Sequence, residues 1–481
     1  MTSQTMKKPE LAPLGFVLLV AGQLMPQMDF SIVNVALEDI NTSLHATHST
    51  LAFIVTLYGL SFAVSLGIAG WLGDRFGRKT IFMSGIVLFG VTSLFCGWSA
   101  NIYELIVARI FQGIAAAMIL PQILATIHVS LSGAAHSKAI GIYGSVGGLS
   151  FVIGQVLGGW LVTANFFDMG WRNVFYLNLP VCLVILCWGY RHIPNTFAEK
   201  TNSFDLQGVS IFAGLIFFIL LSISIGPDLG WSPLVWVMLF LSLPLGVYLY
   251  RVETKKEQLD QSPFLPPTLF SRKQVRAGIF SLTMLSTTFG GFMFVVALTL
   301  QSGFHWSSLQ SGNGFVSLGV MYFVGSLIAN RLAKQFKQSG YRGVIFIGAM
   351  LNLCGYALLF YMMQLRGADL TIWSVFVPFA IVGLGNAFVV NSSIRLYLSD
   401  VPVKFAGIAS AVMTTLQQAT AAIGAALTGA AFAQFYSETD ALNLQSLLAG
   451  LIILVLFMAM LIIFNFRTVF VKDKPQVEEA T

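Results

Sequence analysis

The sequence predicts an all-α integral membrane protein in which fourteen helices cross the bilayer. Hydrophobic residues make up 56% of its 481 residues and charged residues only 10%, whereas a soluble domain carries roughly 25% charged residues. The apolar residues are gathered into long segments that hold almost no charge, and a helix of roughly 20 apolar residues is long enough to span a bilayer. Lysine and arginine are concentrated in alternate connections between these segments, as in a multi-pass protein.

The fourteen segments are separated by connections that are mostly short and polar. In chain order, the predicted spans are residues 12–37, 49–71, 80–99, 102–126, 138–163, 172–191, 206–226, 233–251, 276–300, 312–332, 341–363, 371–393, 405–434 and 445–467.

The distribution of positive charge predicts the orientation of these spans. With the N-terminus in the cytoplasm, 23 of the 26 lysines and arginines fall in cytoplasmic loops and tails. Arg172 and Arg366 fall outside, and Arg109 lies within a span. Positive residues stay on the cytoplasmic side, so both termini are expected there. The net charge of +6 is therefore a sign of topology and gives no indication of nucleic-acid binding.

Two hydrophilic connections, Arg191–Ser203 and Arg251–Arg276, enclose spans seven and eight. The expected arrangement is therefore six spans, an inserted pair, and six more spans. In chain order, we expect an N-terminal six-helix bundle, the inserted helix pair, a cytoplasmic linker, a C-terminal six-helix bundle and a cytoplasmic tail, at residues 1–195, 204–252, 253–275, 276–470 and 471–481.

The two sets of six spans show signs of a duplication. Leu72–Phe76 follows span two, and the similar Leu332–Phe336 follows span ten, 260 positions later. Lys138–Gly141 opens span five, and Lys404–Gly407 opens span thirteen, 266 positions later. Similar offsets at equivalent places in the topology predict two related bundles.

Two ionisable residues lie well inside predicted spans, Asp29 in the first and Arg109 in the fourth. Counted from the outer ends of these spans, both lie about 10–12 Å below the outer surface, at about 1.5 Å per residue. A charge within a span is costly and faces a cavity or a partner. We therefore expect the two side chains to share a cavity, close to a backbone carbonyl that Pro26 leaves unpaired.

The chemistry expected of this pair is an exchange between a proton and a cation. A carboxylate in a partly dry cavity holds a proton more strongly than in water, and a nearby cation opposes that uptake. If the protonated and the cation-bound states favour opposite sides of the membrane, the result is proton-coupled export. Two structural alternatives stay open: Asp29 and Arg109 form a structural ion pair, or Asp29 bonds to neighbouring backbone.

The second half of the chain has no acidic residue inside a predicted span, so its part of a substrate site must come from amide and aromatic side chains. The residues expected to border the cavity are Gln112, Asn34, Gln155, Phe292, Gln417 and Gln418. No His/Cys cluster, Ser-His-Asp set or phosphate-binding Gly-Lys-Ser/Thr loop stands out. We therefore expect no enzyme and no metal, nucleotide or other cofactor.

Two glycine patterns complete the prediction. The stretch between spans two and three is expected to be a tight cytoplasmic loop in which Asp74 caps the following helix. The residues assigned to this gating loop are Gly70, Gly73, Asp74, Arg75, Gly77, Arg78 and Lys79. In span five, glycines four residues apart make a flat face for close packing. These are Gly144 with Gly148 and Gly154 with Gly158, followed by Gly159.

Several of these stretches resemble motifs of the major facilitator superfamily. Gly70–Lys79 resembles the loop motif of the superfamily, and Arg109–Gly113 resembles its span-four motif, Arg-x-x-Gln-Gly. Asp29–Leu37 and Trp171–Pro180 resemble the motifs in span one and at the start of span six of the 14-span drug:proton antiporters.

Gly158 and Gly159 resemble the end of the span-five antiporter motif. In that motif proline usually stands at the position of Gln155, and glycine often stands at the position of Ser150. The chain therefore departs from the antiporter pattern at these two positions.

The resemblance implies a multi-pass protein of the bacterial inner (plasma) membrane with a major-facilitator-type fold. It implies export of hydrophobic or cationic small molecules, such as drugs, dyes and biocides, by alternating access driven by the proton gradient. It also associates Arg109 with proton coupling, and the Gly70–Lys79 loop with closure of the cytoplasmic gate. The expected partners are the substrate, protons and the lipid bilayer, and a periplasmic adaptor is left open.

Two alternatives to this function remain. One is an importer or uniporter of a small metabolite on the same fold. The other is a non-transporting membrane sensor or assembly partner. The sequence argues against this second alternative, because no extramembrane domain is large enough to receive a signal.

Overall fold

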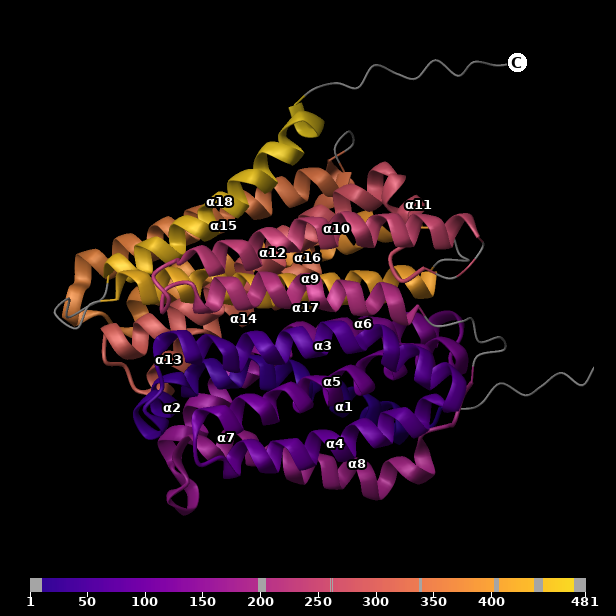
Figure 1. The fold of residues 1–481 in the computed structure, drawn as a ribbon, viewed down its shortest axis with the longest axis horizontal. Coiled ribbons are helices and arrows are strands. Elements are labelled where there is room, and N and C mark those ends of the chain that lie inside the picture. The colour runs from indigo at the N-terminus through magenta and orange to yellow at the C-terminus, as the bar shows by residue number, and fades with distance from the viewer. Residues whose placement is uncertain are drawn as a thin grey trace, which may run out of the picture.

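The computed structural model is a bundle of long helices that run side by side (Figure 1). It describes residues 11–197, 205–259, 261, 263–336, 340–401, 406–436 and 444–470. Within these ranges the regular elements are all helical. The all-helical class predicted from the composition is thus confirmed.

The helices of the first half, and the pair that follows it, are α1 (Pro13–Ile32), η1 (Val33–Ala36), α2 (Leu37–Leu44), α3 (His48–Phe76), α4 (Arg78–Trp98), α5 (Ile102–Ser130), α6 (Gly133–Ala164), η2 (Phe166–Asp168), η3 (Gly170–Arg172), α7 (Asn173–Tyr176), α8 (Asn178–His192), α9 (Leu206–Ile225) and α10 (Pro233–Gln258). The rest are α11 (Pro267–Ser271), α12 (Lys273–Leu298), η4 (Thr299–Gly303), α13 (Ser308–Gly314), α14 (Val316–Gln335), α15 (Gly340–Arg366), η5 (Gly367–Asp369), α16 (Ile372–Leu398), α17 (Ala406–Phe435) and α18 (Leu444–Phe470).

Twelve helical stretches in the described part of the chain are long and apolar enough to cross a membrane. They correspond in order to twelve of the fourteen predicted segments. The other two predicted segments, 138–163 and 405–434, coincide with α6 and α17, which are helices of 32 and 30 residues.

The helix contacts repeat between the two halves. In the first half, α5 packs against α3 and α4, and α1 packs against α6. In the second half, α16 packs against α14 and α15, and α12 packs against α17. The halves meet through two equivalent contacts, α3 with α17 and α6 with α13 and α14. These contacts relate α1, α3, α4, α5 and α6 to α12, α14, α15, α16 and α17, in agreement with the duplication that the sequence offsets predict.

The inserted pair, α9 and α10, breaks this symmetry. Helix α9 packs against both α3 and α17, whereas α10 packs against α9 and α11. In the most apolar stretch of α10 only 17% of the residues are buried, against 44% in that of α9. Helix α9 therefore covers the contact between the halves on one side, and α10 faces outward from it.

A buried polar cluster fixes the end of this pair at which α9 begins and α10 ends. Asp205 caps α9 by accepting a hydrogen bond from Gly208 N at 2.6 Å, and it also accepts bonds from Lys256 Nζ and from Phe264 N. Burial raises the pKa of the Asp205 carboxyl, but these hydrogen bonds outweigh burial and hold the pKa below its usual 3.8. The cluster therefore ties the linker that follows α10 to the start of α9.

The predicted loop at Gly70–Lys79 is corrected by the structure. Helix α3 continues to Phe76 and α4 begins at Arg78, so the turn is reduced to Gly77, whose φ is +100°. That backbone angle is strained for any residue with a side chain. The other assigned residues, which are Gly70, Gly73, Asp74, Arg75, Arg78 and Lys79, are helical.

We expected Asp74 to cap the start of α4, but its side chain accepts no hydrogen bond from the backbone of that helix. Instead it accepts hydrogen bonds from Nε and Nη2 of Arg78 at 3.1 and 2.8 Å. The backbone N–H of Arg78 in turn donates to Thr196 O at 2.9 Å. The α3–α4 turn is thereby attached to the segment that follows α8. Asp74 contributes to this attachment by holding the side chain of Arg78, and this role takes the place of the expected cap.

Candidate functional site

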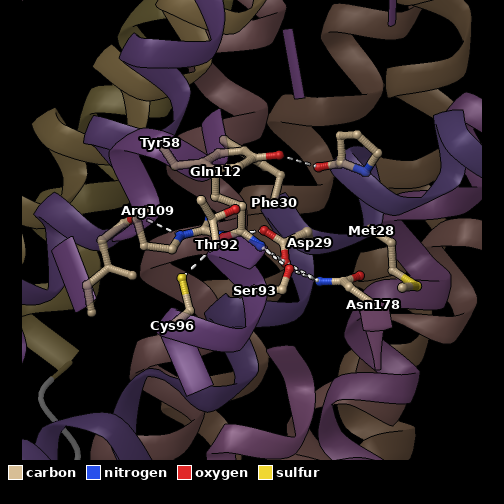
Figure 2. A network of polar contacts seen from close by, with 12 residues as sticks. Met28, Asp29, Phe30, Tyr58, Thr92, Ser93, Cys96, Arg109, Gln112 and Asn178 are labelled. Carbon is tan, nitrogen blue, oxygen red and sulfur yellow. Dashed lines mark hydrogen bonds and ion pairs between the residues drawn. The ribbon is translucent and has the colours of Figure 1, made fainter. Parts of the chain in front are cut away.

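Asp29 and Arg109 lie in direct contact inside the first half of the chain (Figure 2). Asp29 is in the last turn of α1, and Arg109 is near the start of α5. Nη1 of Arg109 donates a hydrogen bond to Oδ2 of Asp29. Both side chains are 0% exposed. The two residues that the sequence placed at equal depth are therefore brought together, and in this conformation they do not border an open cavity.

The other carboxylate oxygen of Asp29 accepts two amide hydrogen bonds. Gln112 Nε2 donates to Oδ1 at 3.2 Å, and Asn178 Nδ2 donates to the same atom at 3.0 Å. The two amides also donate to Oγ of Ser93, at 2.8 and 3.2 Å. A buried ionised group needs such partners to offset the loss of water. Helices α1, α4, α5 and α8 thus meet at one carboxylate.

Arg109 has a second set of partners that is independent of Asp29. Its Nε donates to Ile54 O at 3.2 Å, and its Nη1 donates to Gln112 Oε1 at 2.7 Å. Its guanidinium carbon lies 4.0 Å from the centre of the Tyr58 ring. The Tyr58 hydroxyl donates to Pro26 O at 2.9 Å, beside Asp29 on α1. Helix α3 therefore holds the arginine in place through Ile54 and Tyr58.

This arrangement sets the cost of neutralising Asp29. Removing one member of a buried ion pair costs about 3–5 kcal/mol when the other charge is left unpaired. Here Arg109 would keep a backbone carbonyl, an amide oxygen and an aromatic face, and a desolvated cation–π contact contributes about 2 kcal/mol. Protonation of Asp29 would therefore leave the arginine with these three partners, but its charge would lose its counterion, and its Nη2 has no hydrogen-bond partner among the described residues.

The remaining predicted cavity residues lie elsewhere, apart from Gln112. Asn34 is buried in η1, where its backbone carbonyl oxygen accepts a hydrogen bond from Gln301 Nε2 at 3.4 Å. Gln155 is buried in α6 and donates to Met293 Sδ at 3.4 Å. Both sit where the two halves touch. Gln417 and Gln418 are half-buried on α17.

Phe292 is buried inside the second half rather than beside the ion pair. The centre of its ring lies 5.4 Å from the ring centre of Tyr356, 5.6 Å from that of Phe379 and 6.4 Å from that of Phe315. These four rings form a packed aromatic cluster contributed by α12, α13–α14, α15 and α16. Phe292 is thus part of a helix core in this conformation.

Glycines of α6 allow close contact with two different neighbours. A Cβ at Gly154 would lie 2.1 Å from Ser31 Oγ of α1, and one at Gly158 would lie 2.6 Å from Val35 of η1. A Cβ at Gly159 would lie 2.3 Å from the backbone oxygen of Ser308, in α13 of the other half. The surroundings of the predicted pair Gly144 and Gly148 lie outside the described residues.

Polar contacts also join the two halves beyond the ion pair, at the ends of the helices that the sequence predicts to face outward. Ser302 Oγ donates to Glu38 Oε2 at 2.5 Å, and Ser308 Oγ donates to Asp39 Oδ2 at 2.6 Å. A Cβ at Gly312 would meet the backbone oxygen of Gln155 at 2.3 Å. We call this set of contacts the outer contact. It holds α2 and α6 against η4 and α13.

Several residues of the site were missed by reasoning from the sequence: Asn178, Ser93, Tyr58 and Cys96. Cys96 Sγ lies 3.5 Å from Gln112 Oε1. Asn178 carried a signal, because it lies within the stretch that resembles the start of span six. The others are uncharged residues in apolar helices. In the described part of the chain, no group of three or more His, Cys, Asp or Glu residues is placed to hold a metal ion.

Comparison with known proteins matches most of the chain. The family model described as Major Facilitator Superfamily matches residues 19–213 and 206–425. A tetracenomycin C resistance and export protein of Streptomyces glaucescens is 30% identical over 419 residues, covering 87% of this chain and 75% of that protein. A methylenomycin A resistance protein of Bacillus subtilis is 28% identical over 414 residues, covering 86% of each chain.

A solved structure has a similar fold. A bacterial homologue of the human lysosomal transporter Spinster, solved in an inward-facing and unoccupied conformation, superposes with a TM-score of 0.67. The match covers 95% of this chain and 96% of that one at 14% identity. At that identity the likeness concerns the fold alone.

Proposed function

The chain belongs to the major facilitator superfamily, and on that premise we propose that it is a proton-driven exporter of hydrophobic or cationic small molecules. The relatives named for antibiotic resistance and export support the class of substrate. We propose further that it has fourteen spans, because α6 and α17 coincide with the two predicted segments outside the twelve recognised stretches. The excess of positive charge then supports cytoplasmic termini.

The observation that carries this proposal is the buried Asp29–Arg109 pair with its two sets of partners. The ion pair, together with the amides of Gln112 and Asn178, stabilises the deprotonated carboxylate. When Asp29 takes up a proton, Arg109 stays bound to Ile54 O, Gln112 and the ring of Tyr58. The proton thus removes the ion pair between α1 and α5 and leaves the hydrogen bond from Gln112 as the contact between Asp29 and α5, while the link between α3 and α5 persists.

Alternating access follows from coupling this link to the contacts between the halves. The chain continues from Asp29 on α1 through η1 into α2, whose Glu38 and Asp39 take part in the outer contact. Loss of the ion pair between α1 and α5 allows η1 and α2 to shift against η4 and α13. In this proposal the outer contact is the closed outer gate, and the α3–α4 turn with Asp74 and Arg78 belongs to the cytoplasmic gate.

The test is proton release in reconstituted vesicles. In the proposed cycle, adding a cationic dye to the wild-type protein displaces a proton, and Asp29→Asn abolishes that release. Glu104→Gln is the matched control, because Glu104 is exposed at the outer end of the same helix as Arg109. Undiminished proton release from Asp29→Asn would exclude Asp29 as the coupling group.

The direction of transport needs a separate measurement. Inverted vesicles with an imposed proton gradient are expected to accumulate the dye, and collapse of the gradient with an uncoupler is expected to stop it. Uptake that is indifferent to the uncoupler and stops at equal dye concentrations on the two sides would contradict proton coupling and favour a uniporter.

A further inference from the structure

A groove of about 600 Å³ lies between α12, α15 and α18, far along the chain from the Asp29 site. Its lining falls into two chemical classes, three cationic side chains and three apolar ones: Lys273, Arg276 and Arg342, and Ile279, Phe280 and Phe464. The ring centres of Phe280 and Phe464 are 4.5 Å apart. No acidic residue is among the described residues that line the groove.

The cations lie at one end of the three helices. Lys273 is the first residue of α12, Arg276 lies one turn further, and Arg342 is the third residue of α15. Phe464 belongs to the last part of α18. Two helix N-termini therefore add their positive dipole ends to the three side-chain charges. This end of the bundle carries the excess of lysine and arginine, which marks the cytoplasmic boundary of the membrane.

The charged side chains have room for a ligand. Lys273 and Arg276 are exposed, and Arg342 is half-buried. Arg342 Nη2 also donates to Gln274 Oε1 at 3.3 Å, which fixes the arginine toward the start of α12. The wall of the groove itself is almost entirely apolar, so the charged ends of these side chains belong to its rim at the polar boundary, and the apolar wall runs from there toward the hydrocarbon region.

We propose that this groove binds an anionic phospholipid of the inner leaflet. Its phosphate would lie among the three cations, and an acyl chain would lie along Ile279, Phe280 and Phe464. Basic pockets between membrane helices on the cytoplasmic side are suited to anionic head groups. The juxtaposition of cationic and apolar surfaces at the membrane boundary favours a lipid over a free phosphate, since a free ion has no use for the aromatic wall.

A second groove on the molecule provides an internal comparison. It has about 640 Å³ and lies between α4 and the end of α8, with Lys79 as the cation in its lining. Nζ of Lys79 is already bound to Tyr190 O and lies 4.5 Å from the centre of the Tyr190 ring. This groove has a similar size and an apolar wall, but its charge is occupied. It is not expected to select anionic lipid.

The experiment is native mass spectrometry of the delipidated full chain, titrated with phosphatidylglycerol or phosphatidylcholine. Wild type is expected to bind one molecule of phosphatidylglycerol at least about tenfold more tightly than phosphatidylcholine. The double variant Lys273→Gln, Arg276→Gln is expected to lose about thirtyfold in affinity for phosphatidylglycerol, at about a factor of five per cation. Arg191→Gln, an exposed arginine at the end of α8, is the matched control and keeps wild-type affinity.

Three further arms make the outcome decisive. The charge-conserving variant Lys273→Arg, Arg276→Lys is expected to retain selectivity, which separates a loss of charge from a loss of folding. Lys79→Gln is expected to leave phosphatidylglycerol affinity unchanged. Equal affinity for the two lipids, or an unchanged affinity in the double glutamine variant, would overturn the proposal. Displacement of the lipid by millimolar inorganic phosphate would overturn it as well, because the groove would then be a site for free anions.

Discussion

At the scale of single residues, the most informative contact is the one between Asn178 and Asp29. Asn178 opens α8, and its Nδ2 lies 3.0 Å from Oδ1 of the carboxylate and 3.2 Å from Oγ of Ser93. The asparagine is 1% exposed, so its amide has exchanged water for these two oxygens. A donated hydrogen bond stabilises the carboxylate and not the carboxylic acid. Asn178 therefore helps to hold the Asp29 carboxylate in place.

Asn178→Ala is expected to slow dye efflux by about tenfold, because it removes one of the two amide donors that hold the Asp29 carboxylate. A hydrogen bond to a charged group contributes about 1.5–3 kcal/mol, and 1.4 kcal/mol corresponds to a factor of ten. The measurement is the initial rate of dye efflux from vesicles. Asn173→Ala serves as control, because Asn173 is also buried nearby but donates to Phe166 O. An efflux rate equal to that of wild type would show that Asn178 has only a packing role.

The sequence identified the two charged members of this site and missed the neutral ones for a physical reason. Asp29 and Arg109 stand out because a charge inside a span is costly and rare. Ser93 and Tyr58 do not stand out, because they carry no charge, and a serine hydroxyl in a helix can bond to the backbone of its own helix. Which uncharged residues contact the ion-pair site depends on how α3, α4 and α8 are rotated, and that is decided by packing across the whole bundle.

At the scale of helices, the contact between α6 and α13 is set by backbone proximity. Gly159 and Gly312 face each other's helices so closely that a Cβ on either would lie 2.3 Å from a backbone oxygen. A backbone oxygen cannot move aside as a flexible side chain can. The outer contact between the halves therefore depends on the absence of side chains at these two positions, in addition to the hydrogen bonds of Glu38 and Asp39.

Gly312→Ala is expected to weaken the closed outer contact. Overpacking costs about 1–3 kcal/mol, and 1.4 kcal/mol changes an equilibrium tenfold. A reporter cysteine at the half-buried Leu309 should then react about tenfold faster with a membrane-impermeant maleimide added outside. Gly214→Ala is the matched control, because nothing lies within 4 Å of a Cβ at that glycine of α9. Equal labelling rates in the two glycine variants would refute the role of Gly312 in closure.

Helix positions followed from the sequence more readily than helix ends. The apolar segments gave the helices, since roughly 20 apolar residues need a helix in lipid. The end of α3 did not follow, because glycine and charge between two spans indicate a loop. The helix persists to Phe76 since Gly73 packs against Gln122 of α5, whose Nε2 donates to Ala69 O at 2.7 Å. That stabilising contact comes from a residue about fifty positions away.

At the scale of the whole molecule, the two halves repeat one packing scheme with different chemistry at equivalent places. Phe292 lies 263 positions after Asp29, and Tyr356 lies 260 positions after Cys96, close to the offsets that relate the two halves. The helices that meet at the ion pair, α1, α3, α4 and α5, correspond by their contacts to α12, α13–α14, α15 and α16. The aromatic cluster thus occupies in the second half the place that the ion pair occupies in the first.

This division predicts that the second half can lose stability without losing coupling. Phe292 is 0% exposed and touches three other rings, so Phe292→Ala should cost about 3–5 kcal/mol in unfolding free energy and lower the melting temperature in detergent. The number of protons released per substrate should stay that of wild type, because no titratable group of the ion-pair site is touched. Phe240→Ala, at a phenylalanine of α10 that is 59% exposed, should change neither quantity. A changed proton ratio in a Phe292→Ala protein that still transports would show that the second half shares the coupling and that the charged site of the first half does not act alone.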